Sequence, residues 1–116
     1  MKHSAEYYIE HLEMEPHVEG GYFKECLLEK EERNLWSSIY FMLAKGEVSH
    51  FHRLKSDEVW YYHDGNALTI YMIDEAGKLT AAKLGLDLEK GEVPQVLVPK
   101  GMIFGSAMEE EGFSLV

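Results

Sequence analysis

Short runs of β-branched and aromatic residues, separated at regular intervals by turns, constrain the fold of this chain more than any other feature. Glycine or other turn-forming residues recur at 20–21, 45–46, 64–66, 75–78, 90–91, 99–101 and 111–112. Between them lie runs that we expect to be strands, at 22–28, 36–43, 48–53, 58–63, 68–73, 79–84, 95–98, 102–107 and 113–116. Many short strands with turn signals about every 8–12 residues are typical of a sandwich or a barrel. The pattern therefore predicts an all-β jelly-roll fold.

One helical segment precedes the strands. Ser4 can cap a short helix, and Glu6 in its first turn suits the helix dipole. Pro16 prevents the helix from continuing, so we expect it to run from Ser4 through Met14. No second helical pattern alternates with the strands, which argues against a fold built from βαβ units.

Length and charge limit the domain count and the partners. The chain has 116 residues, which is enough for one domain spanning 1–116. Eleven basic and twenty-one acidic side chains give a formal net charge of −10. A surface of that sign repels phosphate backbones and anionic lipids, and no window of the sequence holds a basic patch. We therefore expect neither a nucleic acid nor a membrane partner.

The cysteine count and the amino terminus indicate the compartment. Cys26 is the only cysteine, so the chain cannot form an internal disulfide, and a reducing cytosol is the simplest context. The first sixteen residues are rich in glutamate and lack the apolar stretch of a secretory signal. We expect a cytoplasmic protein.

The densest chemical signal lies between residues 49 and 62. Side chains in a strand alternate faces, so His50 and His52 should point the same way, about 7 Å apart. Glu58, Trp60 and Tyr62 should share a face of the next strand in the same manner. Two histidines and a carboxylate form a facial triad suited to iron, nickel, manganese or zinc. Without metal, the same groups can serve as a base, its orienting partner and an acid.

The same residues resemble a known family. Gly46, His50, His52, Glu58 and Gly65 resemble the first sequence motif of the cupin superfamily, and residues 99–101 resemble part of the second. Residues 17–23 and 52–60 are similar to Cupin_5, a family of unknown function that shares the fold of deoxysugar epimerases. The resemblance covers the whole chain. It implies a double-stranded β-helix (jelly-roll) cupin barrel with a short N-terminal helix, and a homodimer.

Three departures from the family pattern bear on the site. The gaps between Gly46 and His50 and between His52 and Glu58 differ from those of metal-binding cupins. Phe104 stands where those cupins carry their last histidine, and its ring offers no lone pair. Both departures disfavour a metal cofactor. Relatives also continue past the position of Val116, which makes this a C-terminally shortened cupin-like domain by comparison.

Three functions stay open on these residues. The first is a metal-independent sugar epimerase or isomerase, with His52 as general base, Glu58 as its orienting group and Tyr62 as the acid. In that hypothesis His50 or Arg53 stabilises a developing enolate-like charge. The second is a non-catalytic module that binds a small polar, carbohydrate-like ligand, and the third is a metal-dependent cupin using His50, His52 and Glu58. The residues expected to contact a ligand are His50, Arg53, Tyr22, Trp60 and Phe104.

Overall fold

Strands dominate the chain, as the sequence predicts. The computed structural model describes residues 2–18, 20–30 and 34–116. Its elements are α1 (Ala5–His11), β1 (Glu15–Pro16), β2 (Tyr22–Lys30), β3 (Asn34–Ala44), β4 (Val48–Arg53), β5 (Glu58–Tyr61), β6 (Asp64–Gly65), β7 (Leu68–Ile73), β8 (Leu79–Leu84), the 3₁₀ turn η1 (Leu88–Lys90), β9 (Gln95–Val98), β10 (Ile103–Ala107) and β11 (Phe113–Leu115). The all-β prediction with one short N-terminal helix is confirmed.

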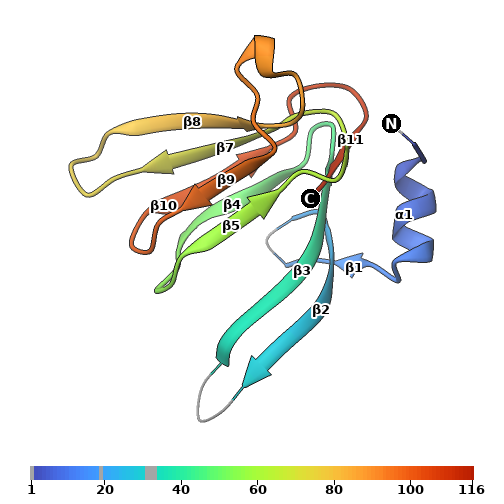
Figure 1. Ribbon diagram of the computed structural model, residues 1–116, viewed down its shortest axis with the longest axis horizontal. Helices are drawn as coiled ribbons and strands as arrows, with labels where there is room; N and C mark the ends of the chain where they lie inside the picture. The colour runs from blue at the N-terminus through green and yellow to red at the C-terminus, as the bar shows by residue number, and fades with distance from the viewer. Residues whose placement is uncertain (1, 19, 31–33) are drawn as a thin grey trace.

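The strands pair antiparallel in three groups. Among the described residues, one sheet has the order β1-β2-β3-β11-β6, a second has the order β4-β10-β7-β8, and β5 pairs with β9. Figure 1 shows β4, β5 and β7 to β10 side by side in one part of the molecule, with α1 beside β11 at the other. The largest buried cluster draws on β3, β5, β7, β8, β9 and β10, including Leu43, Ile70 and Val98. The core therefore lies between the strand groups, as in a jelly roll.

Helix α1 ends earlier than the sequence predicts. The Ser4 side chain accepts a hydrogen bond from the Tyr7 N–H at 3.1 Å, as expected of a cap. Glu13 then adopts a φ of 56°, in the left-handed region, which stops the helix before Met14. Met14 instead packs with Met42 and Phe113 in a second cluster, between α1 and the first sheet. No helix in the described ranges is both long and apolar enough to cross a membrane.

Asp64 ties the amino terminus to β6, a strand of two residues that the sequence presents only as a turn. Its carboxylate accepts from the Lys2 main-chain N–H at 2.8 Å and from the Tyr8 hydroxyl at 2.7 Å. Burial opposes ionisation of Asp64, but these bonds and those from the Gly65 and His3 main chain outweigh it and lower its pKa to about 2. The same bond, with burial, raises the pKa of Tyr8 to about 12. This anchor holds α1 against the sheet.

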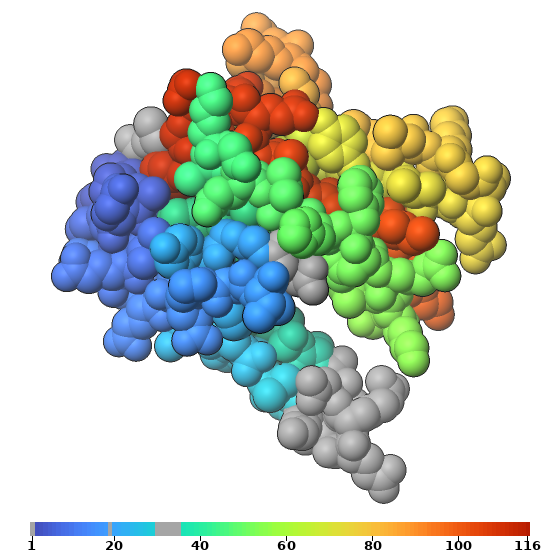
Figure 2. Space-filling view, turned by 180° about the vertical axis from the view of Figure 1, so that it is seen from behind, coloured from blue at the N-terminus to red at the C-terminus, as the bar shows by residue number. Residues whose placement is uncertain are grey.

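The β2–β3 hairpin extends beyond the rest of the molecule. In Figure 1 β2 and β3 project away from the other strands, and Figure 2 shows their cyan and teal atoms toward the lower side of the molecule. Large apolar side chains along it are exposed, among them Leu27 (56% exposed) and Trp36 (53%). Nothing among the described residues covers them.

Candidate functional site

The inner face of β5 carries the polar and aromatic residues that the sequence predicts there. Trp60 is buried and Glu58 and Tyr62 are half-buried, whereas Val59 and Tyr61 are exposed. In the antiparallel pair with β9, Glu58 lies opposite Val98 and Trp60 opposite Val96, both of which are buried in the core. Regular alternation therefore places Glu58, Trp60 and Tyr62 on the core side, and that prediction is confirmed.

Strand β4 does not alternate regularly, and the prediction for His50 is wrong. His52 pairs with Phe104 of β10, but the next pair is Ser49 with Ser106. Two residues of β4, His50 and Phe51, therefore lie opposite Gly105 alone, which is a β-bulge. The bulge shifts the alternation by one residue. His52 and the buried Ser49 share the inner face, whereas His50 is exposed.

Ser49 and Ser106 fix this register. Their hydroxyl oxygens lie 2.6 Å apart, and the Ser106 main-chain N–H donates to the Ser49 hydroxyl oxygen at 3.0 Å. Both residues are buried, so the bonds have little competition from water. The pair keeps Ser49 facing inward. His52 also faces inward but lies three positions later, so the strand between them must contain one extra residue, which is the bulge.

Aromatic rings surround the inner side chains. The His52 ring lies 4.4 Å from that of Phe104, and the Trp60 ring lies 6.4 Å from Phe104 and 6.0 Å from Phe41. Phe104 is only 1% exposed. Phe104 therefore packs directly against the His52 imidazole. These contacts join β4, β5, β10 and β3 in one apolar environment.

Within that environment Glu58 and Trp60 carry polar groups whose hydrogen bonding is incomplete. Burial raises the pKa of Glu58, and the opposing influence of His52 and of the nearby Trp60 N–H does not cancel it. The Trp60 Nε1 atom is buried and has no partner at ordinary hydrogen-bond geometry. A buried polar group without a partner is unfavourable and rare in native proteins. An indole N–H and a carboxyl whose pKa is raised by burial therefore lie together in the apolar interior.

The expected metal triad does not assemble. His50 is exposed because of the bulge, and no group of three or more histidine, cysteine, aspartate or glutamate side chains in the described ranges comes together as metal ligands. The structure therefore does not bring His50, His52 and Glu58 together as a three-ligand group. His52 and Glu58 remain as a pair.

Three further predicted residues differ in their surroundings. Tyr22 packs in the cluster between α1 and the first sheet, on the opposite side of β2 from the core, so it does not meet Trp60. Its neighbour Phe23 packs against the core instead. The Tyr62 hydroxyl donates to the Gly65 carbonyl at 2.6 Å, and burial with nearby Asp64 and Glu92 raises the pKa of Tyr62. Arg53 is exposed and forms no ion pair with any described residue.

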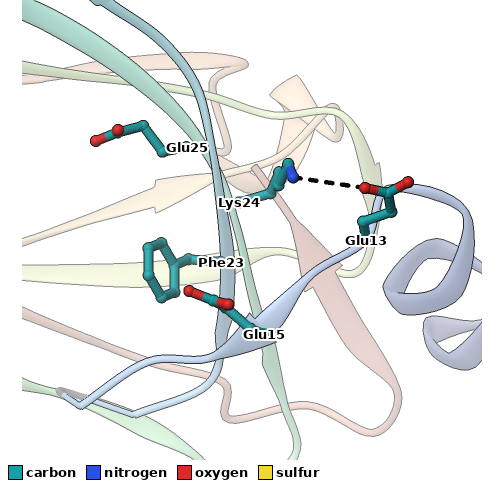
Figure 3. A pocket seen from close by; sticks show the side chains of 5 residues that line it. All are labelled: Glu13, Glu15, Phe23, Lys24 and Glu25. Carbon is teal, nitrogen blue, oxygen red and sulfur yellow. Dashed lines mark ion pairs between the residues drawn. The ribbon is translucent and has the colours of Figure 1, made fainter.

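Two surface cavities lie elsewhere. One, of about 340 Å³, is lined by Glu13, Glu15, Phe23, Lys24 and Glu25. Figure 3 shows Phe23 and Glu15 on one side of β2, with Lys24 on the other in an ion pair with Glu13. The second, of about 560 Å³, lies between the start of α1 and Phe113. Neither is lined by His52, Glu58 or Trp60, but Phe23 lines the first and also packs against the core.

Sequence reasoning missed Ser49 and Ser106, which position His52, and Phe41, which extends the aromatic interior. One signal for the serines was present. Gly105 is an isolated glycine inside a predicted strand, and such a glycine often marks a bulge in one strand of the pair. Gly105 indicates that β10 or a strand paired with it carries a bulge, but it does not indicate which strand has the extra residue.

Comparisons with known proteins agree with this architecture. The family model described as cupin superfamily (DUF985), Cupin_5, matches residues 6–116. A protein of Shewanella oneidensis is similar in structure with a TM-score of 0.91 and 58% identity, over 97% of this chain and 74% of that one. A hypothetical protein from Leishmania major has a TM-score of 0.88 and 33% identity, over 97% and 78%.

A more distant likeness concerns the fold alone. A mutant of Bacillus subtilis oxalate decarboxylase has a TM-score of 0.59 and 20% identity, over 88% of this chain and 26% of that one. Among curated proteins, none matches at a significant level. The family match over nearly the whole chain agrees with the jelly-roll topology and with the resemblance in residues 17–23 and 52–60. The chain belongs to the Cupin_5 family of the cupin superfamily.

Proposed function

We propose that this cupin binds a small polar ligand inside the barrel and acts on it as a metal-independent isomerase or epimerase. The observation that carries the proposal is the polar set on the inner face. A half-buried carboxyl with a raised pKa lies near an imidazole and near a buried indole N–H that makes no hydrogen bond of ordinary geometry. Perturbed carboxyl groups beside a histidine are typical of acid–base sites.

The chemistry divides between two residues. His52 removes a proton from a carbon next to a carbonyl group of the ligand, so that the C–H bond breaks and its electron pair moves into the enol. Glu58, protonated, gives its proton to the carbonyl oxygen as that bond becomes single. When the carbonyl re-forms, an enol hydroxyl gives its proton back to Glu58 and His52 returns its proton to carbon. Delivery to the adjacent carbon yields an isomer, and delivery to the original carbon after the enol has turned over in the site yields an epimer.

Glu58 takes the acid role in place of Tyr62, to which the sequence assigned it. The Tyr62 hydroxyl already donates a hydrogen bond to the Gly65 carbonyl, and a ligand would have to break that bond to receive the Tyr62 proton. The raised pKa of Glu58 favours the protonated form that an acid needs. Tyr62 then supports the wall of the site without exchanging protons.

A carbohydrate-like ligand fits the character of the interior. Ligand pockets are lined mainly by apolar and aromatic side chains, with a few polar groups that fix orientation, and the rings of Trp60 and Phe104 beside His52 have that composition. Phe23, which lines the cavity of about 340 Å³ and packs against the core, supports entry from that side. The single cysteine, which cannot form an internal disulfide, supports a cytoplasmic location.

A homodimer is part of the proposal. The β2–β3 hairpin exposes Leu27, Leu28, Trp36 and Ile39, and a two-stranded hairpin standing alone in water is marginally stable at best. Packing this hairpin against a second copy would remove those side chains from water. The gain is about 25 cal/mol for each Å² of apolar surface buried.

Deuterium exchange tests the proposed reaction. The protein is incubated in D₂O with a panel of neutral aldoses and ketoses and their nucleotide-linked forms, and each carbon-bound proton is followed by NMR. We expect one ligand class to exchange a single proton, with the rate reduced at least ~100-fold in His52→Ala and in Glu58→Gln. His50→Ala, at an exposed position of the same strand, is the matched control and should retain the rate.

Other outcomes are informative. Ligand binding without exchange, detected as a rise in melting temperature, would support the non-catalytic binding module. Equal loss of exchange in His50→Ala and His52→Ala would contradict the assignment of the base.

A further inference from the structure

We propose that the β-bulge at His50 and Phe51 is a positioning device that fixes the tautomer of His52. It places the proton on Nδ1 and leaves the lone pair on Nε2. The use of that lone pair as a base rests on the proposed function, but the tautomer itself follows from the geometry of β4 and β10.

The contact that sets the tautomer is local. The His52 Nδ1 atom lies 2.9 Å from the main-chain carbonyl oxygen of His50. A carbonyl oxygen can only accept a hydrogen bond, so the neutral ring must carry its proton on Nδ1 to make this bond. Nε2 then has a free lone pair, and no described residue donates a hydrogen bond to it. That nitrogen is available to a ligand.

The bulge makes this contact possible. In a regular strand the carbonyl groups point along the sheet toward neighbouring strands, and the side chains stand roughly perpendicular to it. A bulge disrupts the ladder and leaves its extra residue unpaired. The His50 carbonyl can therefore serve a side chain of its own strand.

Residues on β10 hold the bulge in place. A Cβ atom at Gly105 would lie 2.9 Å from the Ser49 carbonyl oxygen and 3.3 Å from Phe51, so a side chain there would push the bulged residues outward. Ser106 binds Ser49 through its hydroxyl and its main-chain N–H. Gly105 and Ser106 thus act on His52 through β4, without contact with the ligand.

The His50 carbonyl performs a task that a carboxylate performs in other acid–base sites. In the serine protease triad, an aspartate holds the histidine in the correct tautomer. Here the His50 carbonyl does so, and Glu58 is not needed for orientation. The sequence hypothesis gave Glu58 that orienting role. Released from it, Glu58 can hold a proton and act as the acid.

The tautomer can be measured directly and without a ligand. Protein labelled with ¹⁵N histidine is studied by long-range ¹⁵N–¹H correlation NMR at a pH where imidazoles are neutral, and His52 is assigned from the His52→Gln spectrum. We expect the His52 proton on Nδ1, and the same result in His50→Ala, because that variant keeps the carbonyl. A His52 proton on Nε2 in the wild-type protein would overturn the proposal.

A matched pair of variants tests the bulge itself. Deletion of Phe51 removes the extra residue while keeping the Ser49–Ser106 pair, whereas Phe51→Ala keeps the length of β4. We expect the deletion to shift His52 toward the Nε2–H form and Phe51→Ala to leave it unchanged. An unchanged tautomer in the deletion, or an equal change in both, would refute the role of the bulge. Gly105→Ala provides the second disruption if the deletion prevents folding.

The two proposals fail separately. If His52 carries Nδ1–H but no carbohydrate exchanges a proton, the positioning device stands and the proposed reaction does not. If proton exchange occurs with His52 in the Nε2–H form, the reaction stands and the positioning device does not.

Discussion

Glu58 lies where burial makes ionisation of its carboxyl unfavourable. Its pKa is raised by desolvation, and neither His52 nor Trp60 restores the ordinary value. A group whose pKa is higher in the folded than in the unfolded state binds its proton more tightly when folded. Its contribution to stability is complete below the unfolded pKa and is lost as the pH rises through the folded pKa.

Glu58→Gln should therefore be more stable than the wild-type protein at neutral pH. Glutamine keeps the shape of the protonated acid but cannot ionise, so the variant should lose less stability than the wild type as the pH rises above 4.5, the ordinary value for this group. Urea unfolding between pH 4 and 8 measures the difference. Glu89→Gln, in the exposed turn η1, serves as control and should follow the wild-type curve. A constant difference between Glu58→Gln and wild type across this range would contradict the shift.

Single residues mark where sequence reasoning succeeds and where it stops. The period of two in a regular strand predicts that Glu58, Trp60 and Tyr62 face the core, and the structure places them there. The position of His50 could not be predicted from its own strand. It depends on Gly105 and on the Ser49–Ser106 pair, which join residues 57 apart in the chain. A sequence pattern records local periodicity but not the register that a distant partner imposes.

Strand β4 depends on one buried hydroxyl for its register with β10. Ser49→Ala would leave the Ser106 main-chain N–H without its acceptor in a buried position, which costs about 1–3 kcal/mol. Ser106→Ala removes only the bond between the hydroxyl groups and should cost less, about 0.5–1.5 kcal/mol. Urea unfolding of both variants checks the order.

Ser37→Ala is the control for this comparison because Ser37 is exposed on β3, and it should change stability by less than about 0.5 kcal/mol. If Ser106→Ala lowers the free energy of unfolding more than Ser49→Ala does, the Ser49 hydroxyl is not the acceptor on which the register depends.

Most elements were predictable because turn residues delimit them. β4, β7, β8 and β9 begin and end at the predicted residues, and β2, β3, β10 and β11 lie within a few residues of their predicted bounds. β1 and β6 were not predictable. Each has two residues, too few for any periodicity, and each exists only because a longer strand lies alongside it.

At the scale of the whole molecule, the β2–β3 hairpin is the surface on which the proposed dimer depends. We expect the wild-type protein to be a dimer by analytical ultracentrifugation, because Leu27 and Trp36 are more than half exposed in the single chain. A charge in the proposed interface, as in Leu27→Glu or Trp36→Glu, should raise the dissociation constant at least ~10-fold, which corresponds to about 1.4 kcal/mol.

Leu88→Glu is the matched control, since Leu88 is 66% exposed but lies in the turn η1. It should leave the dimer intact. A monodisperse wild-type monomer at high concentration would contradict the homodimer, and equal weakening by Leu88→Glu would place the interface elsewhere.

The pairing of Ser49 with Ser106 also sets an order of events during synthesis. The ribosome delivers β4 and β5 early, and His52, Glu58 and Trp60 all leave it before β10 has been made. Until β10 docks, nothing holds Ser49 inward, and a slip of one residue would turn His52 toward solvent. A nascent chain that ends after β9 therefore carries His52, Glu58 and Trp60 but lacks the strand that orients His52. The proposed acid–base pair can form only with the last strands, when contacts distant in sequence finally close.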